Sequence, residues 1–131
     1  MKLLDTDTCV GLLRGRRSVL DRRETERDAL ATSWVTASEL FFGAARSAAP
    51  HENAAAVVRL LDSMTVFGLD LASAKVFGEV KATLAGSGSI VADADLLIAS
   101  IAISRGALLV TGNRKHFERI PGVLMEDWLR P

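Results

Sequence analysis

Four polar side chains at the borders of short apolar runs have the chemistry of a divalent-metal site. They are Asp5 after the run 2–4, Glu39 after 34–36, Asp95 before 96–99 and Asn113 after 108–111. In an open parallel sheet, the ligand crevice lies outside the carboxyl ends of the strands, so residues far apart in the sequence can meet there. Three carboxylates and a carboxamide in one place repel one another unless a divalent cation lies among them. The pattern therefore predicts metal-dependent phosphate chemistry.

The elements that must position these side chains alternate between strands and helices. Apolar runs predict strands over 2–4, 33–36, 65–69, 108–111 and 122–125. Helical spacing of apolar residues predicts helices over 8–14, 38–47, 54–64, 72–84 and 96–103, the second of them capped by Ser38. Strands joined by such helices need crossover connections, which predicts an α/β fold with a mostly parallel central sheet flanked by helices. The order of the strands does not follow from the sequence.

Composition narrows the class of protein. A chain of 131 residues fits one domain. Its 16 Lys and Arg balance 16 Asp and Glu, which excludes a generally basic nucleic-acid-binding surface but leaves room for a local basic patch. The single cysteine, Cys9, has no partner for a disulfide or a thiolate zinc site. No apolar signal region or membrane-length run is present, so we expect a cytoplasmic protein without a membrane partner.

Taken singly, the candidate side chains also have structural interpretations. Asp5 could cap the next helix, and Asp7 could either cap that helix or line the same pocket. Glu39 is expected in the first turn of a helix, where the macrodipole favours an acid in any protein. Asn113 could be an ordinary turn residue.

Asp93 and Asp95 compete for one position at the start of the same predicted helix. Two helical residues at this spacing point about 200° apart, so both cannot face one metal ion. The spacing alone does not choose between them, although Asp93 would suit the N-cap position.

Taken together, the motifs resemble those of one family. The sequence is similar to PIN-domain ribonucleases, and its carboxyl end to the VapC-type toxins of bacterial toxin-antitoxin pairs. The resemblance extends from about residue 2 to residue 128 and rests on the segments LLDTD at 3–7, SELFFG at 38–43, DLLIA at 95–99, LVTGNRKHF at 109–117, IPGV at 120–123 and EDW at 126–128.

The resemblance implies one PIN-like nuclease domain over residues 1–131 and a site made of Asp5, Glu39, Asp95 and Asn113. The three acids would bind Mg²⁺ or Mn²⁺, and a metal-activated water would hydrolyse RNA phosphodiester bonds and so inhibit translation or growth. Relatives often have Asn at the position of Asp7 and usually lack an acid at that of Asp93, so this pocket is more acidic. The side chains expected to surround the ligands are Thr6, Asp7, Asp93 and Thr111.

The same resemblance implies protein partners. A small antitoxin would block the pocket, and the toxin would form a homodimer through helices near residues 44–61.

RNA binding must come from local charge. Few aromatic residues are available for base stacking, so a folded RNA recognised by its shape is favoured over an unstructured strand. His51 and His116 lack an i, i+4 partner for a zinc motif and are expected at the surface. The candidate phosphate contacts, which could flank the predicted metal site, are Arg14, Arg16 and Arg17 after the first helix, and Arg114, Lys115 and His116 just beyond Asn113.

Two alternatives start from the same residues. The segment DTDT at 5–8 also matches the signature of haloacid dehalogenase-type phosphotransferases, in which Asp5 would be a nucleophile. In that family, however, the strand-end Thr motif comes before the acidic pair, whereas here the segment VTGN at 110–113 follows Asp93 and Asp95. A non-enzymatic interaction module is disfavoured because all four site positions have groups that could act in catalysis.

Overall fold

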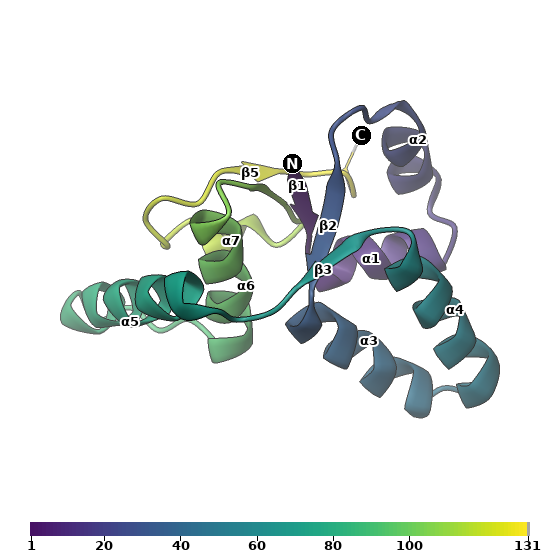
Figure 1. Ribbon diagram of the computed structural model, residues 1–131, viewed down its shortest axis with the longest axis horizontal. Helices are drawn as coiled ribbons and strands as arrows, with labels where there is room; N and C mark the ends of the chain where they lie inside the picture. Colours follow the sequence, from purple (N-terminus) through teal and green to yellow (C-terminus); the bar gives the residue numbers. More distant parts are fainter. Residues whose placement is uncertain (131) are drawn as a thin grey trace.

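The computed structural model describes residues 1–130, and its centre is a five-stranded sheet in the order β3-β2-β1-β4-β5 (Figure 1). Every pair of neighbouring strands is parallel. The chain runs outward from β1 through β2 to β3 and then crosses back to β4, so its direction of winding reverses between β1 and β4. Such a switch point is where ligands bind in open α/β sheets. The strands are β1 Lys2–Leu4, β2 Leu30–Ser33, β3 Thr65–Phe67, β4 Leu108–Val110 and β5 Met125–Glu126.

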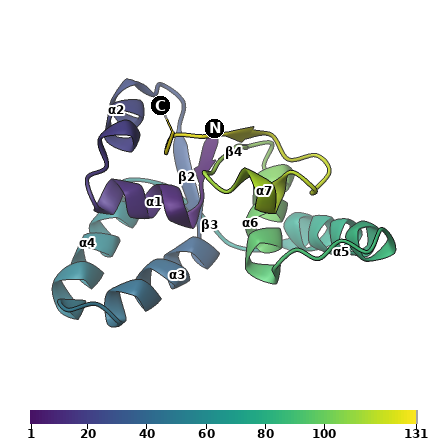
Figure 2. The same ribbon diagram turned by 180° about the vertical axis from the view of Figure 1, so that it is seen from behind.

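Helices cover both faces of the sheet, and α3 with α4 extends to one side while α5 extends to the other (Figures 1 and 2). This confirms the predicted α/β sandwich. The helices are α1 Thr6–Leu13, α2 Arg17–Thr25, α3 Trp34–Ala45, α4 Pro50–Asp62, α5 Leu71–Gly86, α6 Asp93–Ser104 and α7 Arg114–Phe117.

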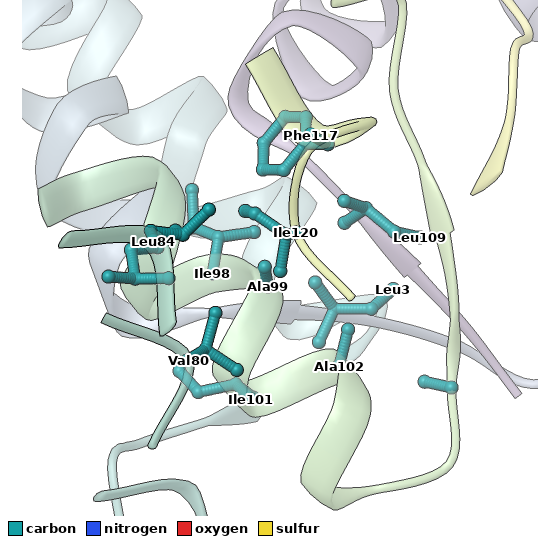
Figure 3. Close-up of a cluster of buried hydrophobic side chains, with 12 residues drawn as sticks. Leu3, Val80, Leu84, Ile98, Ala99, Ile101, Ala102, Leu109, Phe117 and Ile120 are labelled. Atoms are coloured by element: carbon teal, nitrogen blue, oxygen red, sulfur yellow. The ribbon is translucent and has the colours of Figure 1, made fainter. Parts of the chain in front are cut away.

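The core lies in two layers because successive strand residues point to opposite faces of the sheet. Leu3 belongs to the layer beneath α5, α6 and α7, in which Ile98 and Phe117 are also buried (Figure 3). Leu4, the next residue along β1, belongs to the layer beneath α1 to α4. Trp128 is buried in that second layer and anchors the carboxyl-terminal segment.

The predicted strand at 33–36 is wrong, and so is the predicted helix cap at Ser38. The strand is β2, and Trp34 already begins α3. The side chain of Ser33 accepts a hydrogen bond from the backbone N–H of Thr36 at 3.1 Å and caps the helix. The cap starts the helix in spite of the strand preference of Val35 and Thr36.

The remaining differences lie at element ends. The predicted edge strand at 122–125 is the short strand β5, which does lie at the edge of the sheet.

Cys9 is buried, and its burial raises the pKa of the thiol to about 12, so it is an unreactive part of the core. Among residues 1–130, no helix combines the length and the apolar character needed to cross a bilayer.

Candidate active site

The side chains singled out from the sequence line one pocket at the switch point of the sheet. The pocket has a volume of about 490 Å³ and is bordered by the start of α1, α3, the start of α6 and α7. We call it the acidic pocket; its polar lining consists of Asp5, Thr6, Asp7, Glu39, Asp95, Asn113 and His116. The four predicted site positions are thus brought together.

Asp5 is both a helix cap and a wall of the acidic pocket. It follows β1 directly, and its carboxylate accepts a hydrogen bond from the backbone N–H of Thr8 at 2.9 Å, which caps α1. Only 3% of the residue is exposed. Burial raises the pKa of the Asp5 carboxyl above its ordinary value, and hydrogen bonds with Thr111 and Thr8 offset this only in part. No Lys, Arg or His within residues 1–130 forms an ion pair with it.

Glu39 reaches the acidic pocket from the second turn of α3, one turn later than predicted. The hydroxyl of Thr6 donates a hydrogen bond to its carboxylate at 2.9 Å. The same hydroxyl lies 3.2 Å from that of Thr36. Thr6 therefore links the start of α1 to α3 and fixes the carboxylate beside Asp5.

Asp95 faces the acidic pocket and Asp93 does not. Asp95 lies in the first turn of α6, and one of its carboxylate oxygens is 3.2 Å from Nδ1 of His116. The carboxylate of Asp93 points away toward Lys81 on α5, at 3.0 Å. The predicted N-cap role of Asp93 is wrong: the N-cap is Ala92, without a side-chain hydrogen bond, and Asp93 is the first helical residue.

Asn113 enters the acidic pocket from the turn after β4. Its side-chain amide donates a hydrogen bond to the carboxylate of Asp7, so Asp7 lines the pocket and is not the cap of α1. Its backbone N–H donates to the hydroxyl of Thr111 at 2.9 Å. Thr111 is buried and also hydrogen-bonds Asp5, so one threonine links both strand ends at the switch point.

The donor set fits a hard divalent cation. Carboxylate and amide oxygens are the ligands of Mg²⁺ and Mn²⁺, and a buried carboxylate without a cationic partner is stabilised by such an ion. Within residues 1–130, no group of three acidic, histidine or cysteine side chains is arranged to hold a metal. The fit therefore rests on the chemistry of the side chains that line the acidic pocket and not on a preformed group of three ligands. Mg²⁺ keeps several waters and takes only one or two carboxylates together with substrate phosphates.

The predicted basic residues differ in their relation to the acidic pocket. Arg114 and Lys115 line a neighbouring pocket of about 600 Å³ that shares Asn113 and His116 with it. Arg14 and Arg16 line another that shares Asp7. Arg16 also donates to the backbone carbonyl of Leu129 at 2.9 Å. Arg17 borders neither pocket and instead lies 3.9 Å from Asp21.

His116 was predicted to flank the pocket as part of a basic cluster with Arg114 and Lys115, but its contact with an acid of the site was not predicted. It is exposed, as predicted, but it also lines the acidic pocket and contacts Asp95. The only local signal is its position three residues after Asn113 in the short helix α7, which turns both side chains toward the same side.

Comparison with known proteins agrees with this geometry. The PIN domain model matches residues 2–123. The tRNA(fMet)-specific endonuclease VapC of Salmonella typhimurium is 36% identical, with 96% of each chain covered. Ribonuclease VapC2 of Haemophilus influenzae is 30% identical over 97% of each. The crystal structure of DNA-bound VapBC from Salmonella typhimurium superposes with a TM-score of 0.91 at 36% identity, covering 98% of each chain.

These matches do not support the haloacid dehalogenase-type alternative, whose motif order already disagreed with the sequence. The sequence match, the parallel five-stranded fold and the convergence of the family motifs on one pocket agree with one another. The chain therefore belongs to the PIN-domain family, and within it to the VapC-type ribonuclease toxins.

Proposed function

We propose that this chain is a cytoplasmic, Mg²⁺- or Mn²⁺-dependent endoribonuclease in which residues 1–131 form one nuclease domain and the acidic pocket is the catalytic site. The observation that carries the proposal is the meeting of Asp5, Glu39, Asp95 and Asn113 in one pocket, with Asp5 buried and without a cationic partner. Such a pocket is stabilised by a divalent cation and can admit a phosphodiester beside it.

Each side chain has its own role in this proposal. Asp5 and Asp95 would hold the ion, and Glu39, fixed by Thr6, would be available to it from α3. Asn113, fixed by Asp7, would offer a neutral oxygen. When bound, Mg²⁺ or Mn²⁺ supplies an activated water and stabilises the charge that develops on the phosphate. The burial of Asp5 shields its carboxylate from bulk water, which strengthens its attraction for a cation.

The substrate in this proposal is a folded RNA. Arg114 and Lys115 border the acidic pocket and make no ion pairs within residues 1–130, so they are available to backbone phosphates. Arg14 and Arg16 line the pocket that shares Asp7 with the acidic pocket and give that rim the same charge. A relative at 36% identity is a tRNA(fMet)-specific endonuclease, which makes that tRNA the first substrate to test.

A cognate antitoxin and a second copy of the chain are the protein partners in this proposal. A relative's structure is a VapBC complex, and an acidic pocket is readily blocked by a basic side chain of a bound protein. The homodimer expected through residues 44–61 gains support from Val58, which is exposed on α4. Trp34 and Phe42 are exposed on α3, which indicates that the apolar contact surface extends toward the start of that helix.

Cleavage of purified tRNA(fMet) by the chain without antitoxin tests the function. We expect cleavage with Mg²⁺ or Mn²⁺, no cleavage in excess chelator, and product ends carrying a 5′-phosphate and a 3′-hydroxyl. Asp95→Asn prepared in parallel controls for contaminating nucleases. Cleavage that persists in excess chelator, or that is equal for Asp95→Asn, would overturn the proposal.

A further inference from the structure

A second pocket adjoins the acidic pocket and includes residues that the proposed chemistry does not use. It lies between the loop before α6 and helix α7, and its volume is about 330 Å³. It shares Ala92, Asp95 and His116 with the acidic pocket, so a ligand that fills one can extend into the other. Its volume lies at the lower end of the roughly 300–1,000 Å³ that small-ligand sites occupy.

One wall of this second pocket is apolar and anchored. Ile90 is 89% exposed, more than any other large apolar side chain of residues 1–130. The next residue, Val91, packs against the core layer beneath α5 and α6, which holds the loop in place. An isoleucine kept in water at the rim of a pocket gains free energy when a ligand covers it.

The opposite wall is cationic. Lys115 and Arg119 both line it, and neither forms an ion pair within residues 1–130. Lys81 and Arg105, in contrast, are each paired with an aspartate. The two free cations are available to an anion, and the planar guanidinium of Arg119 can also stack on a base.

The geometry points to a subsite for one nucleotide of the RNA, directly beside the phosphodiester that is cut. The base would lie against Ile90 and Arg119, and a phosphate would pair with Lys115. A phosphate alone would not use the apolar wall, and an apolar ligand would not use the cations, whereas a nucleotide uses both. This inference rests on the proposed ribonuclease function, since it places the nucleotide beside Asp95 and His116, which line both pockets.

The test compares two substitutions in the subsite with two matched controls on an RNA whose cut position has been mapped. Ile90→Ser and Arg119→Gln change the subsite, and Leu124→Ser and Arg27→Gln change exposed residues elsewhere. All four side chains are exposed, so the fold is expected to be kept. Each substrate is also prepared with an abasic residue on the 5′ side or the 3′ side of the cut.

We expect Ile90→Ser and Arg119→Gln each to raise KM about fivefold with little change in kcat, and the controls to match wild type. An abasic residue on one side of the cut should raise KM for wild type by a similar factor and add nothing further to Ile90→Ser. If wild type cuts the RNA but both subsite variants match the controls, or if the abasic and Ile90→Ser effects multiply at both positions, the subsite is wrong. If wild type cuts no RNA, the proposed function fails as well.

Discussion

Two side chains outside the expected ligand set hold the carboxylates of the acidic pocket. Thr6 donates to Glu39 at 2.9 Å, and His116 lies 3.2 Å from Asp95. Contacts of this kind fix the orientation of a metal ligand, and their loss commonly costs about 10–100-fold in metal affinity or activity. Catalysis is therefore expected to depend on these neighbours as well as on the acids.

Thr6→Val removes the hydroxyl that donates to Glu39 while keeping the shape of the side chain. We expect kcat/KM for RNA cleavage to fall about tenfold or more, because the Glu39 carboxylate loses its fixed orientation. Thr6→Ser should restore most of the activity. Thr83→Val is the control, since that hydroxyl bonds only the carbonyl of Glu79 within its own helix. Equal activity of Thr6→Val and wild type would remove Thr6 from the site.

Asp95→Asn and Asp93→Asn separate the two acids at the start of α6. We expect Asp95→Asn to lower cleavage about a hundredfold or more, since contacts around a metal ligand alone cost about 10–100-fold. Asp93→Asn should retain nearly all activity and stability, because it loses only an exposed ion pair with Lys81. Cleavage rates and thermal unfolding of both variants decide this. Activity lost in Asp93→Asn but kept in Asp95→Asn would contradict the orientation of α6.

The sequence predicted the acids but not all of their neighbours. Asp5 and Asn113 follow apolar strands, so their meeting at the carboxyl ends of these strands follows from the parallel topology. Helix geometry allowed only one of Asp93 and Asp95 to face the site, and the resemblance to PIN-domain ribonucleases selected Asp95. The contact between Asp95 and His116 did not, because it depends on how α7 packs against α6, and no local pattern encodes that packing.

The carboxyl-terminal segment packs on the turn between β4 and α7 and so positions Asn113 of the acidic pocket. The side chain of Leu129 in the carboxyl-terminal segment packs so closely on Gly112 that a Cβ there would overlap it. The carbonyl of Gly112 also accepts a hydrogen bond from Arg130 at 2.9 Å. The next residue is Asn113, so the tail of the chain fixes the backbone that carries this ligand.

Gly112→Ala is expected to destabilise the fold by about 1–3 kcal/mol, because the added methyl group overlaps the side chain of Leu129, which must shift. Activity should fall with it, since Asn113 moves as well. Gly78→Ala is the matched control: it lies in α5 with open space around the added methyl group and should raise stability by about 0.5–1 kcal/mol. Urea unfolding of both variants measures the difference. A Gly112→Ala variant as stable as wild type would show that the tail does not press on this turn.

The type of a short element is predicted wrongly from the sequence where two local preferences compete. Val35 and Thr36 favour a strand, and the pattern of apolar residues alone cannot distinguish a short strand from the start of a buried helix. The side chain of Ser33 satisfies the backbone of Thr36 and so starts α3 immediately after β2. Because α3 begins early, Glu39 falls in its second turn, where the side chain reaches the pocket.

Over the whole molecule, one ionic cluster joins segments that are far apart in the sequence. Nζ of Lys2 in β1 lies 2.7 Å from carboxylate oxygens of both Glu26 and Glu126. Hydrogen bonds from Lys2 hold the pKa of Glu26 below its ordinary value. Burial acts to raise the pKa of Glu126, but hydrogen bonds from Lys2 and Trp128 and the charges of Lys2 and Arg22 outweigh it and lower the pKa. The cluster therefore links the first strand, β1, to the last strand, β5.

Glu126→Gln tests this closure through the pH dependence of stability. A carboxyl whose pKa is lower in the folded state adds stability above its unfolded pKa and loses it as the pH falls through the folded pKa. We expect the variant to be less stable than wild type by about 1–3 kcal/mol at pH 7, and the difference to shrink as the pH falls below the ordinary value of 4.5. The exposed Glu24→Gln is the control. A difference that stays constant from pH 7 to acid would contradict an ionic role.

Anomalous scattering from a crystal of the chain grown with Mn²⁺ tests most directly whether the acidic pocket binds the catalytic metal. We expect a peak in the acidic pocket within about 2.1 Å of carboxylate oxygens of Asp5 and Asp95, with water completing an octahedral arrangement. The same peak should be absent from crystals of Asp95→Asn. An empty pocket at a Mn²⁺ concentration that supports RNA cleavage, or a peak bound only elsewhere, would contradict the account.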